Sequence, residues 1–145
     1  MLEEFGFKWA ASGGNVLRNS LNAADKASYE SVYSPSQLES AEIACFFRDD
    51  GLSDLIGFEY SKWHADDAVA DLIKHLENIA DFQPEPAVVS IIMDGENAWE
   101  YFPENGYHFL SALYQRLVDH PGIRLTTFSG VLQTQEKPKV LPCVS

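Results

Sequence analysis

Short apolar segments alternate along this chain with stretches of helical periodicity, and this alternation constrains the fold most. Residues 42–47 and 87–93 are apolar on both faces, and residues 66–82 lie between them. A strand that is apolar on both faces needs cover on both, as in a parallel sheet flanked by helices. The apolar positions of the intervening stretch follow helical spacing: Val69, Leu72, Ile73, Leu76, Ile79 and Ala80. The pattern predicts an α/β fold of parallel strands with covering helices.

The same pattern extends to both sides of this central unit. We predict strands at residues 7–11 and 123–128, and helices at 12–25 and 107–119. The second of these helices is expected to bury Leu110, Leu113, Tyr114 and Leu117. The serine-rich residues 26–40 are predicted to be a loop, and the polar tail after residue 132 carries no predicted element. Residues 1–145 are therefore expected to form a single α/β domain.

The charge balance excludes several partners. The chain has 145 residues, of which 46% are hydrophobic, and its net charge is −12 from 22 acidic and 10 basic residues. Nucleic acids and anionic membrane surfaces both favour basic patches, so neither is an expected partner. A neutral ligand such as a sugar is compatible with this composition.

Cysteine content and the first residues bear on compartment and cofactors. Cys45 and Cys143 are far apart and lack partners at metal-ligand spacing, so no disulfide framework or zinc site is expected. The start "MLEEFGFKW" has neither the basic nor the apolar part of a signal peptide, and no apolar run is long enough to span a membrane. The default expectation is a cytoplasmic protein without a cofactor.

Polar residues gather where the second and third predicted strands end. The second strand runs into "RDDG" and the third into "DGEN". Ligands of parallel α/β folds bind at the carboxyl ends of the strands, and neighbouring strands lie about 5 Å apart. We therefore expect Arg48, Asp49, Asp94 and Glu96 to form one cluster. A guanidinium holds nearby carboxyls ionised, whereas a carboxyl without such a partner can act as a general acid.

Each of these residues also has a purely structural interpretation. Asp94 could cap a following helix, Asp49 could be a turn residue, and Arg48 could be an internal ion-pair partner. Trp63, in "SKWHADD", could be a surface residue or a hydrophobic staple ahead of a helix. Aromatic rings beside carboxylates, however, suit a sugar, whose C–H faces pack on an indole while its hydroxyls bind acids. Trp99 follows Asp94 closely enough to serve in this way.

Two other classes of function remain open from the residues. One is a non-catalytic carbohydrate-binding α/β module with the same aromatic and carboxylate lining. The other is a divalent-metal domain, since Asp49, Asp94 and Glu96 would offer the carboxylate oxygens that Mg²⁺ prefers.

Long stretches of the chain resemble the catalytic domain of glycoside hydrolase family 57. These are "FFRDDGLSDLIGFEYSKW", "DAVADLI" and "VSIIMDGENAWEYFPENGYHFLSALYQRL", and the resemblance begins at "FGFKWAASGGNVL". The nearest likeness within the family is to its α-amylase and amylopullulanase members. The resemblance implies a portion of an incomplete (β/α)₇ barrel that acts on α-glucans or maltooligosaccharides with retention of configuration, by hydrolysis or transglycosylation.

The resemblance also implies roles for individual residues. Asp94 matches the general acid/base, and Glu96 and Trp99 fall in the same signature and would line the site. Arg48 and Asp49 match a strand-end pair that we expect in the substrate pocket, and Trp63 would be a pocket wall.

Other parts of the family pattern have no match in this chain. These are the histidine-containing first signature, the nucleophilic glutamate and a Gly-Ser-Trp segment, so we expect a middle portion of a larger catalytic domain. Retaining hydrolysis needs two carboxyls about 5 Å apart, and we therefore expect this portion alone to be inactive. Strands taken from a barrel leave open edges, which favour pairing with a second copy as a homodimer.

Overall fold

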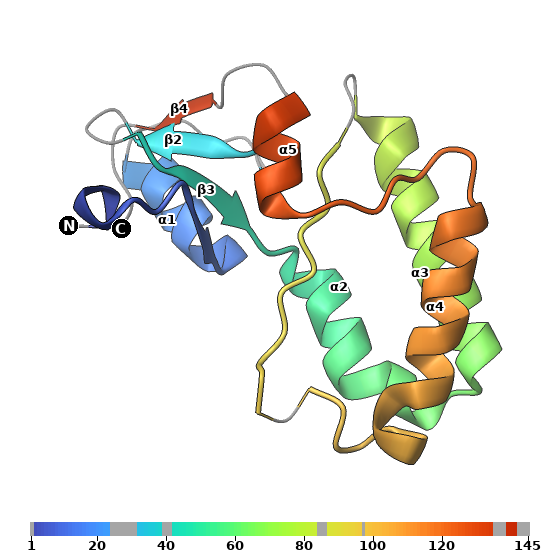
Figure 1. Cartoon of the computed structure of the whole chain (residues 1–145). Coiled ribbons are helices and arrows are strands. Elements are labelled where there is room, and N and C mark those ends of the chain that lie inside the picture. Colours follow the sequence, from blue (N-terminus) through green and yellow to red (C-terminus); the bar gives the residue numbers. More distant parts are fainter. Residues whose placement is uncertain are drawn as a thin grey trace. The chain divides into compact units, whose positions relative to one another are not determined.

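The structure is a computed structural model that describes residues 2–23, 32–38, 42–83, 87–96, 98–134 and 139–141. The chain divides into two compact units, which are described one at a time (Figure 1). The sheet unit comprises Met1–Asp50, Ala87–Ile91 and Thr126–Ser145, and the helical unit comprises Gly51–Pro86 and Ile92–Leu125. The two units are defined by the contacts within each of them. They do not test the prediction that residues 1–145 form a single α/β domain, which stays a prediction.

The sheet unit is built on a mixed four-stranded sheet. Its strands are β1 (Trp9–Ser12), β2 (Ser36–Leu38), β3 (Ala44–Phe47) and β4 (Lys139–Leu141), in the order β1-β3-β2-β4. β1 and β3 are parallel, as are β2 and β4, whereas β2 and β3 are antiparallel. The predicted parallel pairing is thus confirmed for β1 and β3, but an all-parallel sheet is wrong because β2 runs against β3.

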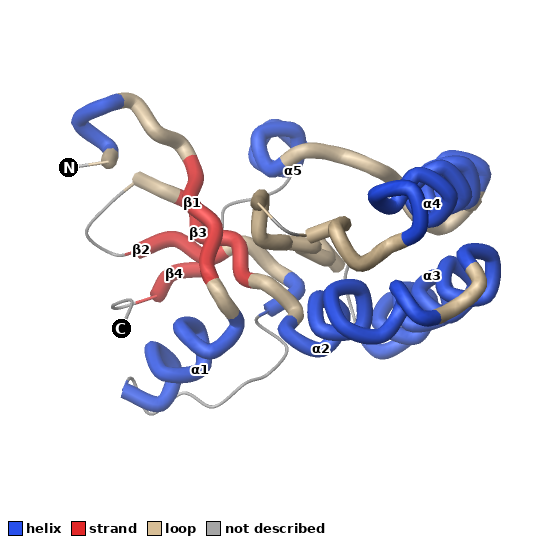
Figure 2. Tube along the Cα trace, turned by 90° about the horizontal axis from the view of Figure 1, so that it is seen from below, coloured by secondary structure: helices blue, strands red, loops and turns tan. Residues whose placement is uncertain are grey.

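Both faces of β3 are covered by a helix. α1 (Gly14–Ala23) and α5 (Phe128–Thr134) lie on opposite sides of the sheet (Figure 2). Successive side chains of a strand point to opposite faces, and Phe47 packs in the cluster with α1 while Phe46 packs in the cluster with α5. The buried partners are Leu17, Leu21 and Val32 on the first face and Val131 on the second. The expected cover on both sides is confirmed for this strand.

Two predicted strands are wrong. Residues 87–93 form no strand, and their one ladder contact is an isolated parallel bridge between Ser90 and Arg48. Residues 123–127 have no regular structure, and Phe128 begins α5. The Thr127 hydroxyl accepts a hydrogen bond from the Gly130 N–H at 3.1 Å, which is the capping arrangement that starts a helix.

Two strands lie where no element is predicted. β2 falls in the predicted loop and β4 in the polar tail, and the two pair with each other. A short 3₁₀ turn, Glu3–Phe5, precedes β1.

The helical unit contains the two long predicted helices. α3 (Ala65–Phe82) and α4 (Tyr107–Asp119) confirm both predictions and pack against each other. A continuous helical segment precedes α3, and a 3₁₀ turn precedes α4. In chain order these shorter elements are α2 (Asp50–Asp54), a π-helix (Leu55–Glu59), a 3₁₀ turn (Tyr60–Lys62) and the second 3₁₀ turn (Pro103–Gly106).

Tyr60 ties the segment ahead of α3 to the core of the helical unit. Its side chain is 1% exposed, and its ring centroid lies 5.9 Å from that of Phe109 on α4. Its hydroxyl donates to Asp71 Oδ2 on α3 at 2.8 Å, and His75 Nε2 lies 3.5 Å from the same oxygen. The expected burial of Tyr114 is wrong, because this residue is 57% exposed, whereas Phe109 on the same helix is buried.

We expect the helical unit to lose stability in alkali through Tyr60. Burial, the hydrogen bond to Asp71 and the charge of Asp71 raise the pKa of this phenol. Above about pH 10, the ordinary phenol pKa, the unfolded chain therefore loses this proton first and the unfolding free energy falls. Tyr60→Phe should lower the unfolding free energy by about 1–2 kcal/mol at pH 7 and flatten its decline above pH 10. Urea denaturation from pH 7 to 11 measures both. Tyr114→Phe, which removes an exposed phenol, is the control, and an unchanged alkaline slope in Tyr60→Phe would contradict the prediction.

Gly14 is the second position at which a small change should be costly. A Cβ built on Gly14 would lie 2.7 Å from the Arg48 carbonyl oxygen, which is a backbone atom and cannot move aside alone. Gly14→Ala should therefore lower the unfolding free energy by about 1–3 kcal/mol. Gly13→Ala is the matched control, because a Cβ there meets nothing within 4 Å. Urea denaturation should give that variant unchanged stability, and equal losses in the two variants would refute the steric argument.

Candidate active site

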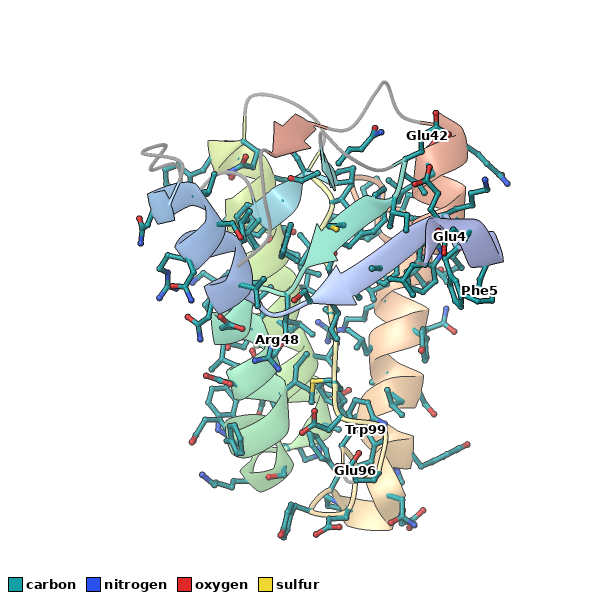
Figure 3. All side chains as sticks on the ribbon, turned by 90° about the vertical axis from the view of Figure 1, so that its left-hand side faces the viewer. Glu4, Phe5, Glu42, Arg48, Glu96 and Trp99 are labelled. Atoms are coloured by element: carbon teal, nitrogen blue, oxygen red, sulfur yellow. The ribbon has the colours of Figure 1, made fainter. Side chains whose placement is uncertain are left out.

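The sheet unit places Arg48 at the carboxyl end of β3 (Figure 3). Its backbone N–H donates to the Ser12 carbonyl at 2.9 Å, and its backbone also bridges to Ser90. The backbone of Arg48 is therefore held from both sides, by the end of β1 and by the segment that follows α3 in the sequence. The predicted approach of this segment to β3 is confirmed at this single pair.

The side chain of Arg48 pairs with Asp50 rather than with Asp49. Arg48 Nε donates to Asp50 Oδ1 at 2.9 Å, with 33% of the arginine side chain and 23% of the aspartate side chain exposed. The other aspartate oxygen lies against Gly14, the first residue of α1, where a built Cβ would be only 2.8 Å from Asp50 Oδ2. The amino end of a helix carries partial positive charge, so a carboxylate is favourable there.

Asp49 has a different partner. Tyr33 donates its hydroxyl hydrogen to Asp49 Oδ2 at 2.5 Å in a partly buried position. Hydrogen bonds from a hydroxyl to a carboxylate are short and strong. The Tyr33 ring also packs against the core cluster on the α1 face of the sheet. Asp49 is therefore linked through Tyr33 to the core of the sheet unit.

The helical unit holds Asp94 at the end of an extended segment. Met93, just before it, packs against the π-helix, since its Cε lies 3.5 Å from a Cβ built on Gly57. Asp94 and Glu96 are both exposed. The next helical element begins at Pro103 and is preceded by Phe102, so Asp94 caps no helix and the capping alternative is wrong.

Trp99 follows on the same loop as Glu96 (Figure 3). Its indole packs against Phe102 and Phe109, with ring centroids 5.5 Å and 6.2 Å away. It also covers Gly106, where a built Cβ would lie only 3.1 Å from the indole Cε3. The side chain is partly exposed, so one part of the indole packs in the core and another part is accessible to a ligand.

Trp63 lies directly before the amino end of α3. Its side chain is 44% exposed, and its ring packs against that of Tyr60 in a T-shaped arrangement with a centroid distance of 5.4 Å. It is therefore a supported surface aromatic residue, which suits a pocket wall as well as a structural role.

The predicted site residues are distributed over both units. Arg48 and Asp49 belong to the sheet unit, and Asp94, Glu96, Trp99 and Trp63 belong to the helical unit. The cluster of Arg48, Asp49, Asp94 and Glu96 therefore stays a prediction. Asn97, which falls in the same family signature as Glu96 and Trp99 and is likewise expected to line the site, lies outside the described residues.

Sequence reasoning missed Asp50 and Tyr33 as partners of the strand-end pair. The spacing of Arg48 and Asp50 could have indicated an ion pair. Tyr33, in contrast, is 16 residues from Asp49 in a segment without a periodic pattern.

The grouping of metal-binding side chains and the length of the helices bear on the other functions considered. Within the described ranges, no three histidine, cysteine or acidic side chains are grouped so that they could hold a metal ion. The metal alternative therefore finds no support there. None of the helices in the described part of the chain is both long and apolar enough to span a membrane.

Comparisons with known proteins give one similar solved structure and one matching family profile. A search of curated proteins finds no match. Among solved structures, the fold is similar to 4-alpha-glucanotransferase from Thermococcus litoralis, with a TM-score of 0.73 and 22% sequence identity over 97% of this chain. The chain spans 21% of the length of that protein. The profile of glycosyl hydrolase family 57 matches residues 1–144. The chain thus belongs to glycosyl hydrolase family 57.

Proposed function

We propose that this chain forms part of a retaining glycoside hydrolase or transglycosidase that acts on α-glucans, and that Asp94 is its general acid/base. One observation carries the proposal: Asp94 is an exposed carboxylate that caps no helix and lies in a family 57 chain. Met93 packs against Gly57 and so anchors the segment that presents it. The similar solved structure is that of a 4-alpha-glucanotransferase, which supports α-glucans as the substrate class and transfer beside hydrolysis.

The proposed chemistry needs a second carboxylate. Asp94 would donate its proton to the glycosidic oxygen as the C1–O bond breaks, while a glutamate outside this chain attacks C1 and forms the glycosyl-enzyme. Asp94, now a carboxylate, would then take a proton from water, whose oxygen attacks C1 and releases the glutamate. In transglycosylation, a sugar hydroxyl would replace that water.

The remaining site residues would bind the sugar. Trp99 and Trp63 each have a partly exposed ring that packs against another aromatic residue, Phe102 and Tyr60 respectively. Such rings suit the C–H faces of glucose. Arg48, Asp49 and Glu96 would bind hydroxyl groups. The same features without the second carboxylate would make a carbohydrate-binding module, which is the alternative we retain. The (β/α)₇ barrel portion and a cytoplasmic location also stay predictions.

The activity of the proposed acid/base can be tested with maltoheptaose. The 145-residue chain alone should give no turnover, because it lacks the nucleophile. A longer protein that joins this chain to a glutamate-bearing family 57 segment should be active, and Asp94→Asn should lower its turnover about 10²–10⁴-fold. Asp119→Asn, an exposed change at the end of α4, is the control. Turnover by the chain alone that Asp94→Asn abolishes would refute the need for an outside nucleophile. Full activity of Asp94→Asn in the longer protein would refute the proposed acid/base.

We also propose that the open edge of β1 pairs with a second copy of the chain. In the described residues, β1 pairs only with β3. The carbonyls of Lys8 and Ser12 accept hydrogen bonds from β3, so the backbone N–H of the alternate residue Ala11 points away from it. Such an unpaired edge is a template for another strand.

Light scattering at high protein concentration should therefore give the mass of a dimer. Ala11→Pro should shift the mass to a monomer, because it removes an outward N–H and proline is tolerated on edge strands. Ala11→Val keeps the N–H and should remain dimeric. A monomeric mass for the unaltered chain would dismiss the proposal.

A further inference from the structure

We infer that Asp50 is a positioning residue, which fixes the guanidinium of Arg48 so that its two outer nitrogens face the hydroxyls of a bound α-glucan. The identity of this ligand rests on the proposed function. The assignment of Asp50 rests on the hydrogen bonds and close contacts at the carboxyl end of β3.

The backbone of Arg48 has little freedom. Its N–H is bonded to Ser12 at 2.9 Å, and its bridge to Ser90 restrains it on the other side. The direction of the guanidinium is therefore set by the torsions of the side chain alone. An arginine side chain has many rotamers, and selecting one costs about 2 kcal/mol of entropy unless another group holds it.

Asp50 supplies that restraint. Its Oδ1 accepts from Arg48 Nε at 2.9 Å, and this is the only side-chain hydrogen bond of Arg48 in the part of the chain that the structure describes. The other oxygen of Asp50, Oδ2, lies close to Gly14 at the amino end of α1, where the helix dipole favours a carboxylate. The neighbouring carboxylate of Asp49 accepts a hydrogen bond from Tyr33.

The contact through Nε determines what Arg48 can bind. A guanidinium has five N–H donors, of which one is on Nε and four are on the outer nitrogens. A carboxylate bound at Nε therefore leaves a planar fork of donors, and 33% of the side chain is exposed. Two adjacent hydroxyl oxygens of a glucose ring match such a fork. A lysine ammonium in the same place would offer a point charge without this geometry.

A simple ion pair that only stabilises the fold would behave differently. In that case Asp50→Asn would lower stability and leave sugar affinity unchanged. If Asp50 positions Arg48, the same change should lower affinity through the arginine. The affinity effect should then disappear in a chain whose arginine is already replaced.

The test is a titration of the 145-residue chain with maltoheptaose. Calorimetry measures the affinity, and ¹⁵N NMR observes the arginine Nε–H signals. Arg48→Lys should weaken binding about tenfold, and Asp50→Asn about three- to tenfold. The double variant should bind no more weakly than Arg48→Lys alone. The Arg48 Nε–H signal should be sharp in the unaltered chain, shift on adding maltoheptaose, and broaden in Asp50→Asn. Glu59→Gln, which removes an exposed ion pair with Lys62, is the matched control and should change neither readout.

Each other outcome has a definite meaning. Wild-type affinity in a folded Asp50→Asn, or independent and additive losses in the double variant, would overturn the positioning role. Undiminished binding by Arg48→Lys would overturn the fork as a sugar contact and leave the proposed α-glucan function standing. Absence of any maltoheptaose binding by the unaltered chain would overturn α-glucan binding itself. If Asp50→Asn fails to fold, the Nε–H signal of the unaltered chain decides, because an Arg48 signal that does not respond to maltoheptaose contradicts the inference.

Discussion

The burial of β3 on both faces is the constraint on which the sheet unit depends. Phe46 and Phe47 are adjacent and point to opposite sides, and their exposed fractions are only 1% and 0%. Burying one such side chain stabilises a fold by about 1.5–3 kcal/mol. A shift of register by one residue would exchange the two faces, each of which is already filled by α1 or α5. The register of β3 is therefore fixed, and so is the position of Arg48, the residue that follows the strand.

Polar groups at that point are arranged by the same apolar packing. Gly14 begins α1 so close to the Arg48 carbonyl that no side chain fits between them, and this closeness brings the Asp50 carboxylate to the amino end of the helix. Tyr33, whose ring contacts the α1-face cluster, holds Asp49. The two neighbouring carboxylates thus have separate partners.

How far the sequence predicts this fold depends on how local the determining contacts are. α3 and α4 were predictable because each carries its own apolar stripe, and β1 and β3 because each is an apolar run. β2 and β4 are three residues long, and β4 follows a polar, proline-containing stretch, so only pairing with distant segments makes them strands. Residues 87–93 show the opposite error, because they are an apolar run but form no strand. Val88 packs against the α5-face cluster, which buries apolar surface without a ladder. For the site, sequence predicted that polar residues follow the apolar runs, but the partners of Asp49 and Arg48 depend on tertiary contacts.

Because Asp94 is exposed, the second carboxylate would have two roles in the proposed mechanism. It would favour the protonated form of Asp94 and it would act as the nucleophile. A general acid works best when it is desolvated or lies beside another carboxylate, since both conditions favour its protonated form. A sugar stacked on the open part of Trp99 would remove water from the loop that also carries Glu96. The nucleophilic glutamate, about 5 Å from the acid in retaining enzymes, would supply the neighbouring charge before it attacks. Once the glycosyl-enzyme forms, that charge is lost, and the same residue would become a better acceptor for the proton of water. In this mechanism the charge of the glutamate decides whether Asp94 acts as an acid or as a base. Asp94 itself need not move between the two steps, which agrees with the packing of Met93 against Gly57.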